Sequence, residues 1–148
     1  MSSSNELIRR RMRQALGGGV QAWMQEGSSD PRHLMGVDMF PEHMLSVRAT
    51  VESGRDTEFN RWYDNEHVPD AVRMLPGCIG AARYKVVLGD GSHQYMALYA
   101  FESAAKLADA LSGPEIMELI KIYDRDIGAF STRVRTTYQR VLLHPKTS

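Results

Sequence analysis

The chain has 148 residues, 43% of them hydrophobic and 24% charged, which are ordinary proportions for one soluble globular domain. Its 18 Lys and Arg residues balance 18 Asp and Glu residues, whereas a nonspecific nucleic-acid binder would need a cationic excess. The only cysteine, Cys78, excludes an internal disulfide and zinc sites built on several cysteines. No apolar run approaches the ~20 residues of a membrane span and no signal peptide is recognisable, so we expect a cytoplasmic protein.

Residues 1–43 differ from the rest of the chain by their density of Gly and Pro, which break regular structure. Residues 6–16 have the spacing of a short amphipathic helix, with Ile8 and Met12 on its apolar face. A helix of this length is not stable alone. We therefore predict a partly helical arm over residues 1–43, which packs on the main domain or on a partner subunit or else frays, and a domain over residues 44–148.

The first predicted elements of the domain are a strand and a helix. Apolar and polar residues alternate over 44–51, which is the pattern of a half-buried strand. A helix capped by Asp56 or Thr57 should then run to about residue 67, because Val68 precedes a proline and that position disfavours helical backbone. A second short helical segment is predicted over 69–74.

Two strands joined by a Gly-rich turn, two helices and a last strand complete the domain, over 78–88, 93–101, 103–111, 115–127 and 131–143. The order βαββαβ is that of the ferredoxin-like α+β fold, an antiparallel sheet with helices on one face. The other face has no cover from its own domain, so it must be polar or meet a partner.

The alternation within each strand predicts what that uncovered face carries. In the first strand it carries Ser46, Arg48 and Thr50, because the apolar residues must face the helices. In the third strand we expect Met96 and Leu98 to face the helices. The opposite parity, which suits a more polar cavity, carries His93, Tyr95 and Tyr99. One-residue bulges reverse such assignments, which leaves open the faces of Arg83, Arg133 and Arg135.

The helix before residue 67 carries the residues best suited to chemistry. At ~100° per residue, Phe59, Trp62, Tyr63 and Glu66 share one sector. A carboxylate within an apolar stripe must be paired, protonated or facing a cavity, because a lone buried charge is unfavourable. The alternative is that the aromatic stripe is ordinary core.

His67 follows at the end of this helix, where the helix dipole favours the protonated imidazole. Asp64 or Glu66 beside it would raise its pKa further. An imidazole that titrates near neutral pH is a suitable general acid and base. The alternative is that His67 only completes the helix end.

The run from Trp62 to Pro69 resembles the Y-x-x-x-H-x-P signature of EthD-like proteins in the dimeric α+β barrel superfamily. The Pro76-Gly77 turn before a strand and the βαββαβ order are also similar, so the resemblance covers about residues 44–143. It implies a homodimer with a ligand cavity between sheet and helices. His67 and Tyr63 match the histidine and tyrosine of the signature.

These observations predict a small cofactor-independent enzyme of the isomerase, cyclase or lyase type, acting on a cyclic or aromatic oxygenated metabolite in a catabolic or secondary-metabolic pathway. His67 would move a proton, Glu66 or Asp64 would orient it, and Arg48 would hold a carboxylate or oxyanion. The predicted pocket wall consists of Trp62, Tyr63, Tyr84, His93, Tyr95 and Tyr99.

Two alternatives stay open, a non-catalytic dimeric binding or accessory protein and a cofactor-free monooxygenase of the same fold. We predict no metal, although Glu66, His67 and His93 could meet in the cavity as ligands. The resemblance leaves haem open, because the superfamily includes haem-dependent enzymes. We expect no nucleic acid and no membrane among the partners.

Overall fold

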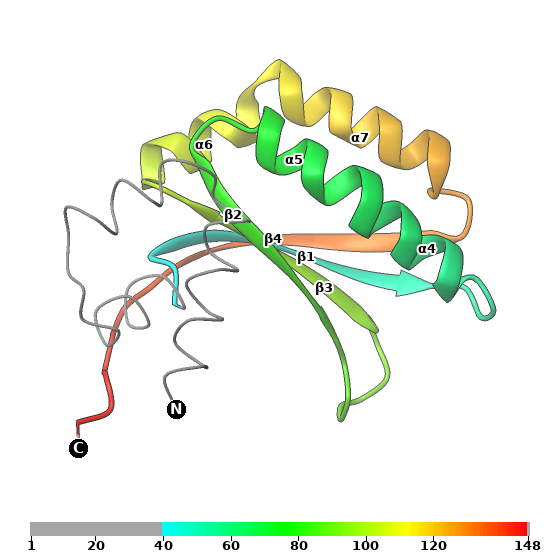
Figure 1. The fold of residues 1–148 in the computed structure, drawn as a ribbon, viewed down its shortest axis with the longest axis horizontal. Helices are drawn as coiled ribbons and strands as arrows, with labels where there is room; N and C mark the ends of the chain where they lie inside the picture. Colours follow the sequence, from blue (N-terminus) through cyan, green and yellow to red (C-terminus); the bar gives the residue numbers. More distant parts are fainter. Residues whose placement is uncertain (1–39, 148) are drawn as a thin grey trace. The chain divides into compact units, whose positions relative to one another are not determined.

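The computed structural model describes residues 40–147 (Figure 1). The chain separates into a unit of residues Glu42–Gln139, which contains the sheet and helices, and a second unit formed by Met1–Pro41 and Arg140–Ser148. In the described part of the second unit, an Arg140 Nη1 hydrogen donates to the carbonyl oxygen of Phe40 at 2.8 Å. The helix predicted over residues 6–16 lies outside the described residues.

The sheet has four antiparallel strands in the order β2-β3-β1-β4. They are β1 (His43–Val51), β2 (Cys78–Lys85), β3 (Tyr95–Phe101) and β4 (Ser131–Gln139). The helices lie on one side of it (Figure 1). They are α4 (Asp56–Trp62), α5 (Val68–Met74), α6 (Ala104–Ser112) and α7 (Pro114–Asp126). This arrangement confirms the predicted ferredoxin-like α+β fold. Within residues 40–147, no helix is both long and apolar enough to cross a membrane.

The core lies between this sheet and its helices. In β1 the side chains of Leu45, Val47, Ala49 and Val51 are buried, as their alternation predicts, and Arg48 is exposed on the other face. Neighbouring strands share these faces through their register, so Val47 lies between Ala97 of β3 and Arg135 of β4.

The predicted parity of β3 is wrong. Tyr95 and Tyr99 pair with Ala49 and Leu45, so they face the helices and are buried. Met96 and Leu98 lie on the opposite face with Arg48. Polarity misled the prediction, because a tyrosine ring contributes a large apolar surface to a core when its hydroxyl can find a polar neighbour.

The predicted helix break before Pro69 is also wrong. Helix α4 continues through a five-residue π-helical turn, Tyr63–His67, directly into α5. In this π turn the Val68 N–H donates to the carbonyl oxygen of Tyr63, one residue further back than in an α-helix. Because Pro69 has no N–H to donate, the helix loses a backbone hydrogen bond there in any case, and the wider turn accommodates the loss.

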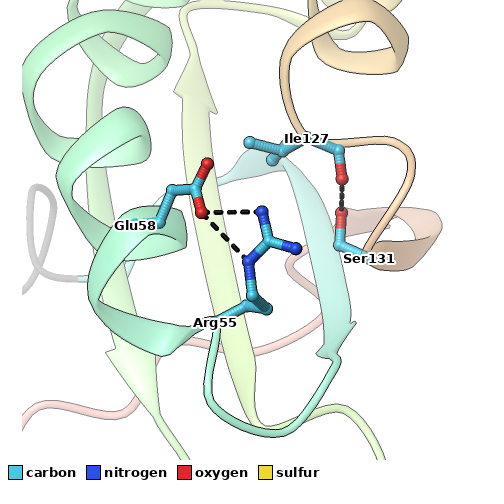
Figure 2. Close-up of polar contacts among 4 residues, drawn as sticks. All are labelled: Arg55, Glu58, Ile127 and Ser131. Carbon is cyan, nitrogen blue, oxygen red and sulfur yellow. Dashed lines mark hydrogen bonds and ion pairs between the residues drawn. The ribbon is translucent and has the colours of Figure 1, made fainter.

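The start of α4 does not use the predicted Asp56 or Thr57 cap. Arg55 precedes the helix without a side-chain cap, and its guanidinium donates to Glu58 Oε2 at 3.0 and 2.7 Å instead (Figure 2). Figure 2 also shows the junction of α7 with β4, where the Ser131 hydroxyl donates to the Ile127 carbonyl oxygen at 2.8 Å. This contact anchors the first residue of β4, the strand that carries Arg133 and Arg135.

Candidate functional site

A cavity of about 30 Å³ lies between the sheet and the helices. Most of its wall is aliphatic, with side chains from β1, α5 and α7 such as Leu45, Val47, Leu75, Ile116 and Leu119. The polar members of the wall are Tyr63, His67, Tyr99, Arg133 and Arg135. The volume exceeds the ~10–15 Å³ that one water needs. The site is therefore a small, mostly apolar cavity with a concentrated polar end.

Each polar side chain reaches the cavity through a specific element. The π turn places Tyr63 and His67 side by side, with ring centroids 5.1 Å apart. Tyr99 comes from the helix-facing side of β3. Arg133 and Arg135 come from β4, opposite Ala49 and Val47, so they too face the helices. The register settles the parity that was left open for these two arginines.

The imidazole of His67 is enclosed by aromatic rings. It stacks on Trp62 at 4.6 Å with planes 17° apart, and it meets Tyr123 edge-on at 6.4 Å. The Trp62 indole N–H is itself fixed by a 2.9 Å hydrogen bond to Asp126. His67 Nδ1 is buried and has no hydrogen-bond partner among the described residues. The ring is thus held in place by packing, with a polar nitrogen left free.

The predicted raised pKa of His67 is wrong. Burial, and secondarily the positive charge of Arg133, lower the pKa of His67 to about 4, while Asp70 opposes this shift. The prediction relied on the helix end and on carboxylates nearby in sequence, but desolvation of a cationic ring outweighs both. At neutral pH His67 is therefore an uncharged imidazole, able to accept a proton or a hydrogen bond.

Two other buried polar atoms of the wall lack partners within residues 40–147, the hydroxyl oxygen of Tyr99 and Nη1 of Arg133. Tyr99 is only 2% exposed, and burial raises its pKa, so its phenol stays protonated and can donate. The Arg133 guanidinium lies 3.5 Å from the Tyr123 ring centroid, which stabilises the cation without using its N–H groups. Burial and the nearby Arg133 lower the pKa of Arg135.

The predicted orienting carboxylates do not reach His67. Asp64 accepts a 2.7 Å hydrogen bond from Arg83 on the β2 side, and Glu66 is exposed. The π turn explains the error, because it changes the angular positions that a regular helix would give these residues. Within the described residues, no carboxylate orients the imidazole.

The structure places four more predicted residues outside the cavity wall. Arg48 and Tyr84 lie on the sheet face away from the helices, where Tyr84 is 52% exposed. His93 lies in the β2–β3 hairpin, where its Nδ1 is 3.1 Å from the Thr50 hydroxyl. Tyr95 is buried beside α4 and donates to Asp56 at 2.6 Å. Of the predicted site, the structure brings together Tyr63, His67 and Tyr99 in the wall, with Trp62 behind His67.

The sequence interpretation assigned no role to Arg133 and Arg135. The only available signal was their spacing of two in a strand where Val134 lies between them. Residues 40–147 contain no group of three His, Cys, Asp or Glu side chains arranged for a metal, so Glu66, His67 and His93 do not form such a group. The absence of a metal stays a prediction.

No protein-family model and no curated protein matches the chain. Solved structures do match it, and one is an EthD family protein from Bacillus halodurans, with 21% identity over 63% of this chain and 96% of that chain and a TM-score of 0.47. SnoaB, a cofactor-independent oxygenase from Streptomyces nogalater, is 15% identical over 71% of this chain and 99% of its own, with a TM-score of 0.52.

A variant of MhuD with manganese protoporphyrin IX bound is 19% identical over 70% of this chain and 99% of its own, with a TM-score of 0.53. At these identities the likeness concerns the fold. The chain therefore shares the ferredoxin-like α+β fold of these proteins, which confirms the predicted fold class.

Proposed function

We propose that the protein is a small enzyme that uses His67 as a proton acceptor and donor on an oxygenated metabolite, without a cofactor, in an isomerisation, cyclisation or lyase reaction. The observation that carries this proposal is that three residues of one cavity wall each have a buried polar atom without a partner among the residues described. These atoms are Nδ1 of His67, the hydroxyl of Tyr99 and Nη1 of Arg133. Buried polar groups are normally hydrogen-bonded, so such a set is typical of a site that a ligand completes.

His67 suits proton transfer within a substrate. With a pKa of about 4 it is unprotonated at neutral pH and ready to take a proton. Once protonated inside the cavity it is a stronger acid than an ordinary imidazolium, so it returns the proton readily to a second position of the same substrate. This property fits reactions that relocate a proton and does not require a second catalytic acid.

Arg133 takes the role that was predicted for Arg48. When a base removes a proton next to a carbonyl, negative charge develops on the oxygen, and fixed donors stabilise it best where water is excluded. Arg133 and Tyr99 supply such donors beside His67, whereas Arg48 lies across the sheet.

The cavity volume limits what can bind. At about 30 Å³ it is far below the roughly 300–1,000 Å³ of a pocket for a drug-sized ligand. An aromatic metabolite therefore requires the wall to open, and Arg135 is an exposed wall residue whose side chain can move without disturbing the core. A porphyrin such as the one bound to MhuD does not fit the cavity in this form.

Turnover measurements on His67 variants test the proposal. Aromatic acids and lactones are screened by thermal stabilisation, and those that bind are followed by NMR for conversion. We expect His67→Asn to lower kcat by about 10²- to 10⁴-fold. The matched control is Arg61→Gln, an exposed arginine of α4 outside both the cavity wall and the sheet, with activity unchanged. Full activity of His67→Asn on a substrate that the wild type converts would contradict this mechanism.

A specific observation also supports a second candidate, a non-catalytic binding protein. His67 lacks a carboxylate that would fix its tautomer, within the described residues, and such a partner is common in histidine catalysis. This candidate predicts binding without conversion in the same screen. Oxygen consumption during conversion would instead indicate an oxygenase, the activity named for SnoaB.

We further propose that a second copy of the chain covers the sheet face opposite the helices. Tyr84, Val134 and Tyr138 are exposed there by 52%, 41% and 43%, beside Met96 and Leu98. Apolar surface of this kind on a sheet face is typical of an interface. We expect sedimentation to report a dimer and Leu98→Glu to sediment as a folded monomer. A monomeric wild type would contradict this proposal.

A further inference from the structure

We propose that the cavity binds the carboxylate of a small apolar acid, with Arg133 and Tyr99 as its direct ligands and Arg135 as a second positive charge. This inference names the substrate class of the site and rests on the proposed function only in using the same cavity. It makes carboxylate recognition, and the residues responsible for it, testable without knowledge of the reaction.

The polar end of the cavity carries positive charge that no acidic side chain of its wall balances. Two guanidinium groups line the cavity, and its wall contains no Asp or Glu. No ion pair involving Arg133 or Arg135 occurs within residues 40–147, although five other ion pairs are found there. Cations that are partly removed from water are normally paired, because desolvation disfavours the isolated charge. An anion in the cavity would supply the missing partner.

The polar end of the cavity also has hydrogen-bond donors without acceptors among the described residues. Nη1 of Arg133 can only donate, and Tyr99 keeps its proton because burial raises its pKa. Both groups are buried and without a partner in the described part of the chain, so the ligand must offer acceptors to both. A carboxylate has two oxygens with about four acceptor positions and can satisfy both donors at once. A neutral amide has one acceptor oxygen and brings N–H donors that find no acceptor at Arg133.

The rest of the cavity wall is aliphatic. Away from its polar end the cavity is bounded by Leu45, Val47, Ile116 and Leu119. An apolar body fits these side chains, whereas a phosphate dianion would lose hydration on all sides and gain donors on only one. The shape and polarity together favour a monocarboxylate attached to a small hydrocarbon group.

A third arginine on the helix-facing side of the sheet, Arg83, differs from Arg133 and Arg135 because it has an acidic partner. Arg83 on β2 donates to Asp64 at 2.7 Å and to Asn60 at 2.9 Å. Its charge is already balanced by a side chain of the domain. An arginine on this side of the sheet is therefore paired where it is structural, and the two arginines of the cavity are the exception.

Calorimetric titration of the full chain at pH 7 tests the inference. The probes are acetate and benzoate, each matched with its neutral amide, together with inorganic phosphate, all up to about 10 mM so that millimolar affinities are detected. We expect at least one carboxylate to bind at least tenfold more tightly than its amide and more tightly than phosphate. Equal binding of acid and amide, stronger binding of phosphate, or no binding by either carboxylate would overturn the inference.

Variants locate the binding site. Arg133→Met should weaken carboxylate binding at least tenfold and Tyr99→Phe should weaken it severalfold. Arg61→Met, at an exposed position of α4 outside the cavity wall, should leave binding unchanged. Circular dichroism checks that each variant is folded, and Tyr99→Phe, which removes only a hydroxyl, keeps the test valid if Arg133→Met does not fold. Undiminished binding by Tyr99→Phe, or by folded Arg133→Met, would overturn the assignment.

The pKa of His67 provides a separate measurement of carboxylate binding, because it depends on the positive charge of Arg133 and Arg135 near the ring. The charged and titratable groups around His67 are Arg133 and Arg135 of β4, Asp70 of α5, and the phenols of Tyr63, Tyr99 and Tyr123. A bound carboxylate offsets the two arginines, so NMR titration of the His67 ring should show a higher pKa with benzoate than with benzamide. An unchanged pKa with bound benzoate would contradict binding at this site.

The two proposals fail in different ways. Carboxylate binding through Arg133 together with turnover that is independent of His67 would overturn the proposed mechanism and leave the carboxylate site standing. His67-dependent turnover of a neutral lactone, with no preference for carboxylates, would overturn the carboxylate site and leave the mechanism standing.

Discussion

Two clusters of arginine, tyrosine and other polar side chains lie between the same sheet and the same helices, yet they differ in how completely their polar atoms are partnered. The paired cluster, at the β2 side, consists of Asp56, Asn60, Asp64, Arg83 and Tyr95. The open cluster, at the cavity, consists of Tyr63, His67, Tyr99, Arg133 and Arg135.

The paired cluster is a continuous chain of hydrogen bonds. Tyr95 donates to Asp56 at 2.6 Å and accepts from Asn60 at 3.2 Å, and Arg83 donates to Asn60 and Asp64. Arg83 also lies 4.7 Å from the Tyr63 ring centroid. These contacts tie α4 and the π turn to β2 and β3, which is a structural role.

The open cluster contributes three of the four buried side-chain atoms without partners in the described range. Leaving a buried polar group unpaired costs about 1–3 kcal/mol. The comparison teaches that residue type alone does not mark a site, since arginine and tyrosine occur in both clusters. The unused hydrogen-bonding capacity distinguishes the cavity as the place for a ligand.

The largest expected difference between the clusters is in pH dependence. The pKa of His67 is about 4 in the folded chain and about 6.5 when unfolded, so between these values the unfolded chain binds more protons. Stability should therefore be highest above pH 6.5 and fall as the pH decreases toward 4, by up to about 3 kcal/mol. Urea unfolding across this range should show a smaller loss for His67→Asn than for the wild type. If the free energy of unfolding depends on pH identically in the wild type and in His67→Asn, then His67 is accessible to water and its pKa is ordinary.

The same substitution at one arginine of each cluster should have different effects. Arg83→Met removes two charge-assisted hydrogen bonds and should lower the free energy of unfolding by about 2 kcal/mol, since half-exposed Asp64 can partly resolvate. Arg133→Met removes an unpaired charge and a stacking contact with Tyr123, so stability should stay within about 1 kcal/mol of wild type. If urea unfolding shows that both variants lose the same free energy of unfolding, the two clusters do not differ in the way proposed.

The smallest expected difference is in the stability effect of removing the hydroxyl group from each of two tyrosines of β3. Tyr95→Phe removes a hydroxyl with two partners and should cost about 1 kcal/mol. Tyr99→Phe removes a hydroxyl with none, and the unliganded protein should be as stable as wild type or gain up to about 1 kcal/mol. Thermal unfolding of the two variants side by side measures this. A loss in Tyr99→Phe equal to that in Tyr95→Phe would show that its hydroxyl is already bound.

The fold was predictable because its signals are local. The alternation of 44–51 and the order of the elements are confirmed by the sheet. The face of Tyr95 and Tyr99 was not predictable from polarity, because their environment depends on α4 and the π turn above them. In the strand Ser131–Gln139 the more apolar side, with Val134 and Tyr138, faces away from the helices, so only pairing with β1 determines where Arg133 points.

The candidate site was predictable in part for the same reason. His67, Tyr63 and Trp62 lie on one segment, and the structure brings them together. The environment of His67 was mispredicted because Arg133 comes from a strand far along the chain and because Asp64 is held by Arg83. A pKa depends on burial and on neighbours in space, which neighbours in sequence do not specify.

The central claim is that the open cluster holds a carboxylate and that the paired cluster does not. A crystal structure of the full chain grown with whichever of acetate and benzoate binds more tightly in solution tests it most directly. We predict the bound carboxylate within hydrogen-bond distance of the Arg133 guanidinium and the Tyr99 hydroxyl, with its apolar group against the aliphatic wall. The carboxylate at Arg83, or an unchanged cavity with Arg133 and Tyr99 still without partners under saturating ligand, would contradict the account.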